Sequence, residues 1–100
     1  MIHVLAFITA HKGKRSELLD AFSNVVPQVH TEKGCIEYQA VTDAVDAGDI
    51  QTPLGPDSFV VVEKWETLDD LKAHSASEHM VQYGKSAGHL VASRVIHILQ

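Results

Sequence analysis

Apolar and β-branched side chains gather in four short runs, and each run has the pattern of a β-strand. The predicted strands are Ile2–Thr9, Cys35–Thr42, Phe59–Glu66 and Leu90–Leu99. The first and third runs carry apolar residues at both odd and even positions. A strand of this kind is covered on both faces of its sheet.

Helical periodicity separates these strands. The stretch from Lys14 to about Val29 has an apolar stripe at three- and four-residue spacing, formed by Leu18, Phe22, Val25 and Val29. Pro27 should kink this helix or end its regular part, because proline removes one amide donor and crowds the preceding turn.

Two shorter helices are predicted after the third strand, at Leu68–His74 and Glu78–Ala87. Thr67 with Asp70 has the spacing of a capping box, in which the threonine oxygen accepts from the first free amides. Ser75 with Glu78 repeats that spacing, which predicts a break between the two helices.

The order β-α-β-β-α-α-β, with the last two helices as one layer, is typical of the ferredoxin-like split β-α-β fold. We therefore predict an α+β protein with a four-stranded antiparallel sheet and helices on one face only. Because two strands are apolar on both sides, we expect the bare sheet face to pack on the same face of a second copy.

The segment Asp43–Asp57 is long for a connection between two strands, and it contains two glycines and two prolines besides its acidic residues. Connections of this length often form lids or binding loops. A plain surface insertion explains the composition equally well. In either case we expect the segment to be more mobile than the strands it joins.

The composition excludes several classes of protein. The chain has 100 residues, a formal charge of −5 and one cysteine, which predicts a single domain over residues 1–100 without a disulfide framework. No basic cluster suits nucleic acid or an anionic membrane, and no apolar run approaches the ~20 residues of a membrane helix. The N-terminus lacks the layout of a signal peptide, so we expect a cytoplasmic protein.

Familiar catalytic and metal motifs are missing. Seven histidines are many for this length, but no HExxH or clustered cysteine–histidine pattern occurs, so we expect no metal site. Cys35 has no adjacent lysine or arginine to favour a thiolate and is expected to be a half-buried apolar residue. No nucleophile elbow or phosphate-binding glycine pattern is present.

One corner of the predicted fold combines groups with chemical potential. Trp65 ends the third strand, and His74 lies one helix later. Trp65 could wall a cavity between sheet and helices, with His74 as a base or hydrogen-bond donor. Tyr38 and Tyr83 could add hydroxyl groups to that cavity. The alternatives are a core tryptophan, a partly exposed histidine near a helix end, and tyrosines at the edges of the core.

The chain resembles the antibiotic biosynthesis monooxygenase family of dimeric α/β-barrel proteins. The resemblance rests on the pattern E-x-G-C-x-x-Y, followed by E-x-W and a helix with H-x-x-x-x-H. The matching residues are Glu32, Gly34, Cys35, Tyr38, Glu63, Trp65, His74 and His79. The pieces match in order and spacing over nearly the whole chain, although the connection 43–57 is longer than is common in the family.

The resemblance implies a homodimer that joins its sheet faces and holds a cavity in each subunit. It also implies oxygen insertion into a small phenol, quinol or anthrone by dioxygen, with neither flavin nor metal as cofactor. Trp65 would orient the ring and His74 would be the base or donor. Phe22, Tyr38, Tyr83 and His79 are counted as candidate substrate contacts. The matching Glu63 and His79 could instead stabilise the strand and the helix corner.

Two alternatives are weighed against this monooxygenase reaction. Haem-degrading relatives use an asparagine on the first strand, and Ile2–Thr9 contains none, which argues against haem degradation. The alternative from another class is a non-catalytic, dimeric ligand-binding or stress-response protein of the same fold.

Overall fold

The computed structural model describes residues 1–100. Its elements in chain order are β1 (Ile2–Ala10), α1 (Arg15–His30), β2 (Cys35–Val41), the 3₁₀ turn η1 (Gly48–Ile50), β3 (Ser58–Trp65), α2 (Leu68–Ala76), α3 (Glu78–Ala87), η2 (Gly88–Leu90) and β4 (Val91–Leu99). All four strands and all three helices lie where the sequence pattern predicts them. Their ends differ from the predicted ones by at most two residues.

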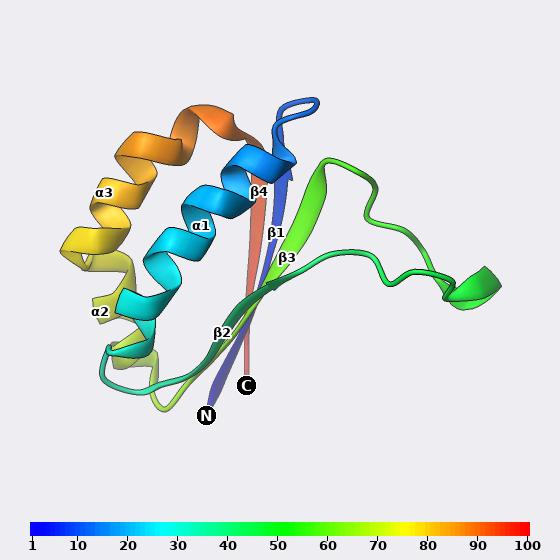
Figure 1. Cartoon of the computed structure of the whole chain (residues 1–100). Helices are drawn as coiled ribbons and strands as arrows, with labels where there is room; N and C mark the ends of the chain where they lie inside the picture. The colour runs from blue at the N-terminus through cyan, green and yellow to red at the C-terminus, as the bar shows by residue number, and fades with distance from the viewer.

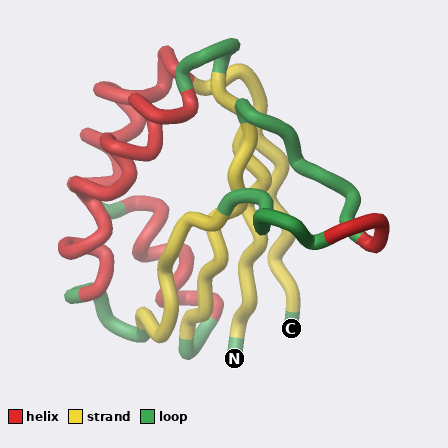
Figure 2. Tube along the Cα trace, turned by 45° about the vertical axis from the view of Figure 1, so that its right-hand side comes forward, coloured by secondary structure: helices red, strands yellow, loops and turns green.

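The strands form one sheet in the order β2-β3-β1-β4, and all neighbours are antiparallel. The helices cover one face of this sheet (Figures 1 and 2). The predicted ferredoxin-like α+β fold is therefore confirmed. The sheet is open at both edges, so one chain does not by itself close a barrel.

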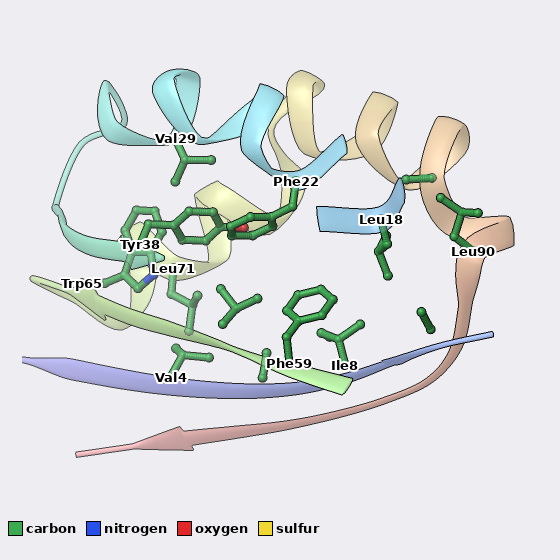
Figure 3. Packing of buried hydrophobic residues seen from close by; sticks show 14 of the residues in the cluster. Val4, Ile8, Leu18, Phe22, Val29, Tyr38, Phe59, Trp65, Leu71 and Leu90 are labelled. Carbon is green, nitrogen blue, oxygen red and sulfur yellow. The ribbon is translucent and has the colours of Figure 1, made fainter. Parts of the chain in front are cut away.

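The core lies between the helices and the inner sheet face. Alternate residues of β1 and β3 are buried there, because the register pairs Val4 with Glu63 and Ala6 with Val61. The stripe predicted for α1 is buried against them through Leu18, Phe22, Val25 and Val29. Figure 3 shows Phe22 and Tyr38 side by side between α1 and the sheet, with Trp65 at the end of β3.

Pro27 does not end α1, contrary to one of the two outcomes that we expected from it. The helix continues for three residues beyond it to His30. Both Pro27 and Ser23, whose carbonyl would have accepted the missing amide, are exposed. Water can therefore replace the hydrogen bond that the proline removes.

Two local predictions need correction. The spacing Ser75–Glu78 is not the cap of α3; Ser77 occupies the N-cap position, and its hydroxyl donates to the carbonyl of His74 at 2.7 Å. A bulge between Cys35 and Glu37 pairs Cys35 with Trp65, so the cysteine faces the helices. Strict alternation along the predicted strand would place Cys35 on the face opposite Tyr38.

The outer sheet face carries no helix and keeps exposed apolar side chains. They are Phe7 on β1, Val41 on β2, and Val95 and Leu99 on β4. The connection between β2 and β3 projects away from the helices (Figure 1). Asp43 organises its base by accepting from the amides of Leu54 and Gly55 at 2.8 and 3.0 Å. No helix combines the length and apolarity that a bilayer crossing requires.

Candidate functional site

A cavity of about 470 Å³ lies between the inner sheet face and the helices α2 and α3. Its wall is mostly apolar and comes from all four strands and all three helices. The polar groups in the wall are few: Tyr38, Glu63, Lys72, His74, Ser75, Tyr83 and Arg94. A mostly apolar cavity with a few polar groups is the usual form of a small-molecule site.

His74 reaches this cavity from the last turn of α2, and one carboxylate fixes its orientation. The Nδ1 atom of His74 lies 2.9 and 3.2 Å from the two carboxylate oxygens of Glu32. A carboxylate only accepts, so Nδ1 carries the proton and Nε2 keeps a free electron pair. Nε2 has no hydrogen-bond partner in the protein. Every fully buried side-chain nitrogen or oxygen has such a partner, so the Nε2 atom of this cavity-lining residue is not fully buried.

Glu32 binds a second histidine in the same way. His79 Nε2 lies 2.7 Å from Glu32 Oε2 and 3.2 Å from Ser77 Oγ. Because the Ser77 hydroxyl donates to the His74 carbonyl, its oxygen is left to accept from His79. Ser77, at the break between α2 and α3, thus joins the His74 backbone to the His79 ring, and Glu32 joins the two rings.

The local sequence explains how Glu32 reaches the helix corner. Gly34 has φ +79°, and a β-carbon there would collide with the Asp70 side chain. Only glycine lets the turn after α1 approach α2 this closely. The Gly34 carbonyl also accepts from the Glu66 amide at 2.9 Å. On the other side, Thr67 caps α2 by accepting from the Asp70 amide at 3.1 Å, as its spacing predicts.

Glu63 and Trp65 form a buried pair on β3. The indole Nε1 donates to Glu63 Oε1 at 2.9 Å. Glu63 lines the cavity, and burial raises the pKa of its carboxyl, although the hydrogen bond from Trp65 opposes the rise. Trp65 itself is 0% exposed and is absent from the cavity wall. Its ring packs instead on the His74 ring, with centroids 4.7 Å apart.

Three aromatic residues complete the apolar side of the site. Phe22 stacks on Tyr38 with ring centroids 5.2 Å apart, and Tyr38 meets the edge of the His74 ring at 5.1 Å. Tyr83 meets the Phe22 ring from α3 at 6.4 Å. All three line the cavity. Burial raises the pKa of both tyrosines, so these phenols stay protonated and can donate hydrogen bonds. The Tyr38 hydroxyl donates to the Met80 sulfur at 4.0 Å, a weak contact that a substrate oxygen could replace.

Cys35 and the histidines offer little support for other chemistry. Burial and the nearby carboxylates of Glu32 and Glu63 raise the pKa of the Cys35 thiol, which disfavours the nucleophilic thiolate. No three histidine, cysteine or acidic side chains are grouped so that they could hold a metal ion. The two histidine nitrogens nearest to Glu32, His74 Nδ1 and His79 Nε2, donate hydrogen bonds to its carboxylate.

The structure brings together most of the residues that the sequence singled out, but not all in the predicted place. His74, Tyr38, Tyr83 and Phe22 line the cavity, whereas Trp65 and His79 do not. The prediction that Trp65 walls the cavity is wrong in its geometry, because the buried indole contacts Glu63 and His74, which line the wall, and does not line it itself. Trp65 is a buried support for two groups that do line it.

Sequence reasoning missed three residues of this region. Glu32 belongs to the E-x-G-C pattern, but no role was assigned to it. A signal existed, because an acid placed before a positive-φ glycine at a helix corner is suited to partner a buried histidine there. Lys72 and Arg94 line the cavity from α2 and β4, and their side-chain direction could not be read without the packing of those elements.

Comparison with known proteins gives a consistent result. The sequence profile of the family described as "Antibiotic biosynthesis monooxygenase" matches residues 1–86. The Escherichia coli K12 protein named "Probable quinol monooxygenase YgiN" is 35% identical over 102 residues, which cover 100% of this chain and 97% of the relative.

Solved structures agree on the fold. A conserved protein from Methanosarcina mazei Go1 superposes with a TM-score of 0.83 at 19% identity, covering 99% of this chain and 90% of that one. PA3566 from Pseudomonas aeruginosa gives a TM-score of 0.79 at 23% identity, with 98% and 90% covered. The match to the family profile extends over most of the sequence and includes the Glu32–Gly34 turn, β3 and the histidines of α2 and α3. This chain belongs to the antibiotic biosynthesis monooxygenase family.

Proposed function

We propose that this protein is a monooxygenase that oxidises a small electron-rich aromatic, of the quinol, phenol or anthrone class, with dioxygen and without flavin or metal. One observation carries the proposal: His74 presents an unpartnered Nε2 to a mostly apolar cavity while Glu32 holds its Nδ1–H. This is the arrangement of an oriented general base. Family membership and the name of the E. coli relative support the same reaction class.

The chemistry needs only deprotonation, orientation and exclusion of water. His74 Nε2 takes a phenolic proton, and the resulting imidazolium is stabilised by the Glu32 carboxylate. The aromatic anion gives one electron to dioxygen, and the radical pair forms a carbon–oxygen bond. The ring hydroperoxide then loses water to give a quinone with one added oxygen. For a quinol, one dioxygen yields one hydroxyquinone and one water, so atoms and electrons balance.

The surrounding residues have distinct roles in this proposal. Phe22 and Tyr38 provide flat apolar surface for the substrate ring, and the protonated Tyr38 and Tyr83 hydroxyls can donate to its oxygens. Trp65 is a positioning residue, because it packs on the His74 ring and holds Glu63. His79 acts through Glu32 rather than through contact with substrate.

We further propose that the protein is a homodimer that joins the outer sheet faces. Phe7, Val95 and Leu99 stand exposed there on neighbouring strands. Two such faces packed together would bury an apolar surface that the helices of one chain leave open.

Oxygen uptake with 1,4-naphthohydroquinone tests the function. The protein is first dialysed against a chelator, and its absorption spectrum is checked for flavin. His74→Ala and the near-isosteric His74→Asn should each lower turnover by about 10²–10⁴-fold, while His89→Ala, which changes an exposed histidine outside the cavity, should keep full activity. Equal uptake by His74→Ala and wild type at every pH would remove His74 from the reaction.

The same assay addresses the alternative of a non-catalytic ligand-binding protein. Quinols react slowly with oxygen on their own, so the uncatalysed rate is subtracted. A wild-type protein that binds the quinol but never exceeds that background would favour the binding alternative.

A further inference from the structure

The charge balance of the cavity wall is opposite in sign to that of the whole chain. The protein has 13 acidic and 8 basic residues, yet the cavity wall contains Lys72 and Arg94 as cations and only Glu63 as an acid. Burial raises the pKa of Glu63, which favours its neutral form. An acidic protein thus lines this cavity with net positive charge.

Both cations lack a partner. The ion pairs of the protein join Lys64 to Glu37, and His74 and His79 to Glu32. Neither Lys72 nor Arg94 pairs with a carboxylate or makes a side-chain hydrogen bond. The Arg94 guanidinium also opposes the rise that burial causes in the pKa of Tyr83, which places its charge beside the cavity phenol.

The strand register sets Arg94 far from the base, whereas Lys72 lies on α2 only two residues before His74. Arg94 pairs with Ile8 on β1, whereas Glu63, which lies beside His74, pairs with Val4. Four residues along a strand span roughly 13 Å. A substrate of two fused rings with its hydroxyl at His74 would therefore extend toward the guanidinium.

We infer that Arg94 selects a hydroxylated aromatic substrate that carries an acidic substituent, such as a carboxylate or sulfonate, on the side remote from the reacting hydroxyl, while Lys72 adds positive charge to the cavity wall. This inference deepens the proposed function and rests on the same cavity. The apolar wall holds the rings, and the Arg94 guanidinium holds the anion by charge-assisted hydrogen bonds. Both cations are exposed, so an uncharged aromatic of the same size leaves them hydrated and binds more weakly because it lacks this ion pair.

Isothermal titration calorimetry with two related phenols tests the inference without requiring turnover. Wild type should bind 6-hydroxynaphthalene-2-sulfonate, whose two groups lie at opposite ends of the fused rings, about tenfold more tightly than 2-naphthol, which lies between the effects of exposed ion pairs and of buried charged hydrogen bonds. The preference should shrink when salt is raised from 50 to 500 mM, because these cations are open to solvent.

Matched variants locate the effect. Arg94→Gln should weaken binding of the sulfonate by about 5- to 10-fold and Lys72→Gln by about threefold, and each should change binding of 2-naphthol by less than twofold. Lys85→Gln, which removes an exposed lysine of α3 outside the cavity, should change neither. Equal affinity of wild type for the two phenols would overturn the inference, as would equal weakening of both phenols in the two cavity variants.

These results are separable from those of the oxygen-uptake assay. A protein that prefers the sulfonate but never consumes oxygen would refute the monooxygenase proposal and keep the anion site. Turnover of quinols with no preference for anions would do the reverse. Failure to bind either phenol would overturn the inference together with the assignment of the cavity as an aromatic site.

Discussion

Replacing Glu32 by glutamine changes one oxygen to an amino group and tests the arrangement on which the proposed chemistry depends. The carboxylate accepts from His74 Nδ1 at 2.9 Å and from His79 Nε2 at 2.7 Å. Both bonds end at the same oxygen, Oε2, so a glutamine whose oxygen takes that position can keep them and loses only the negative charge. A glutamine turned the other way presents its amino group to His74, so Nδ1 must become the acceptor, and the proton moves to Nε2, where the substrate proton would go.

The expected size of the effect follows from the lost interaction. A hydrogen bond to a charged group contributes about 1.5–3 kcal/mol, and the carboxylate also stabilises the imidazolium that forms as His74 takes a proton. Since about 1.4 kcal/mol is tenfold in rate, kcat should fall about 10- to 100-fold. Glu32 does not line the cavity, so KM should change by less than twofold.

Steady-state oxygen uptake gives kcat and KM separately, and ¹⁵N NMR of the histidine rings reports which nitrogen carries the proton. Glu32→Asp keeps the charge and should recover part of kcat. Glu66→Gln makes the same change in charge at an exposed acid that follows β3 and should be neutral. An unchanged kcat in Glu32→Gln, or a loss that comes only through KM, would refute the role of Glu32 in orienting the base.

Three further predictions concern the fold around the site. Glu63→Gln should remove a pH dependence of stability. Burial raises the pKa of Glu63 above its ordinary 4.5, so the unfolding free energy of wild type should fall as pH rises through the raised pKa. Melting curves from pH 4 to 8 should show no such fall in the variant. Gly34→Ala should lower the unfolding free energy by about 3 kcal/mol in urea titrations. The control Gly13→Ala shares the positive φ but has open space around its Cα, so it should lose only about 1 kcal/mol. Equal losses in the two variants would contradict the steric argument. Phe7→Lys should shift the protein toward monomer in sedimentation equilibrium while Val81→Lys, an exposed change on α3, should not; a wild type that is already monomeric at micromolar concentration would reject the dimer.

The sequence predicts the elements well because each has a strong local signal. The α1 stripe, the Thr67 cap and the two-sided apolar runs of β1 and β3 all depend on neighbours within a few residues, and all appear as expected. The errors come from effects that act across the chain. The bulge at Cys35 is set by pairing with β3, and sequence alternation carries no trace of it.

The candidate site was predicted in part for the same reason. His74 and Tyr38 could be found because an aromatic and a helix-end histidine near one corner suggest a cavity. Whether Trp65 lines that cavity or packs behind it could not be read from the sequence. In the structure Glu63 accepts a hydrogen bond from the indole N–H and lines the cavity, whereas Trp65 does not. Glu32 and Arg94 reach the site from separate elements, so only the assembled fold brings them to His74 and Tyr83.

Strand β4 has exposed apolar side chains on both faces, one toward the proposed ligand and one toward the proposed dimer partner. On the inner side, Ile96 and Ile98 line the cavity and stay 51% and 54% exposed, because α2 and α3 do not cover this edge of the sheet. On the outer side, Val95 and Leu99 stand equally open. Apolar burial is the main stabilising term for a chain of this length, at about 25 cal/mol per Å². A bound aromatic would cover the inner isoleucines and a second copy the outer pair. Each would then raise the stability of the folded chain in proportion to its occupancy, so the melting temperature should rise with both ligand and protein concentration.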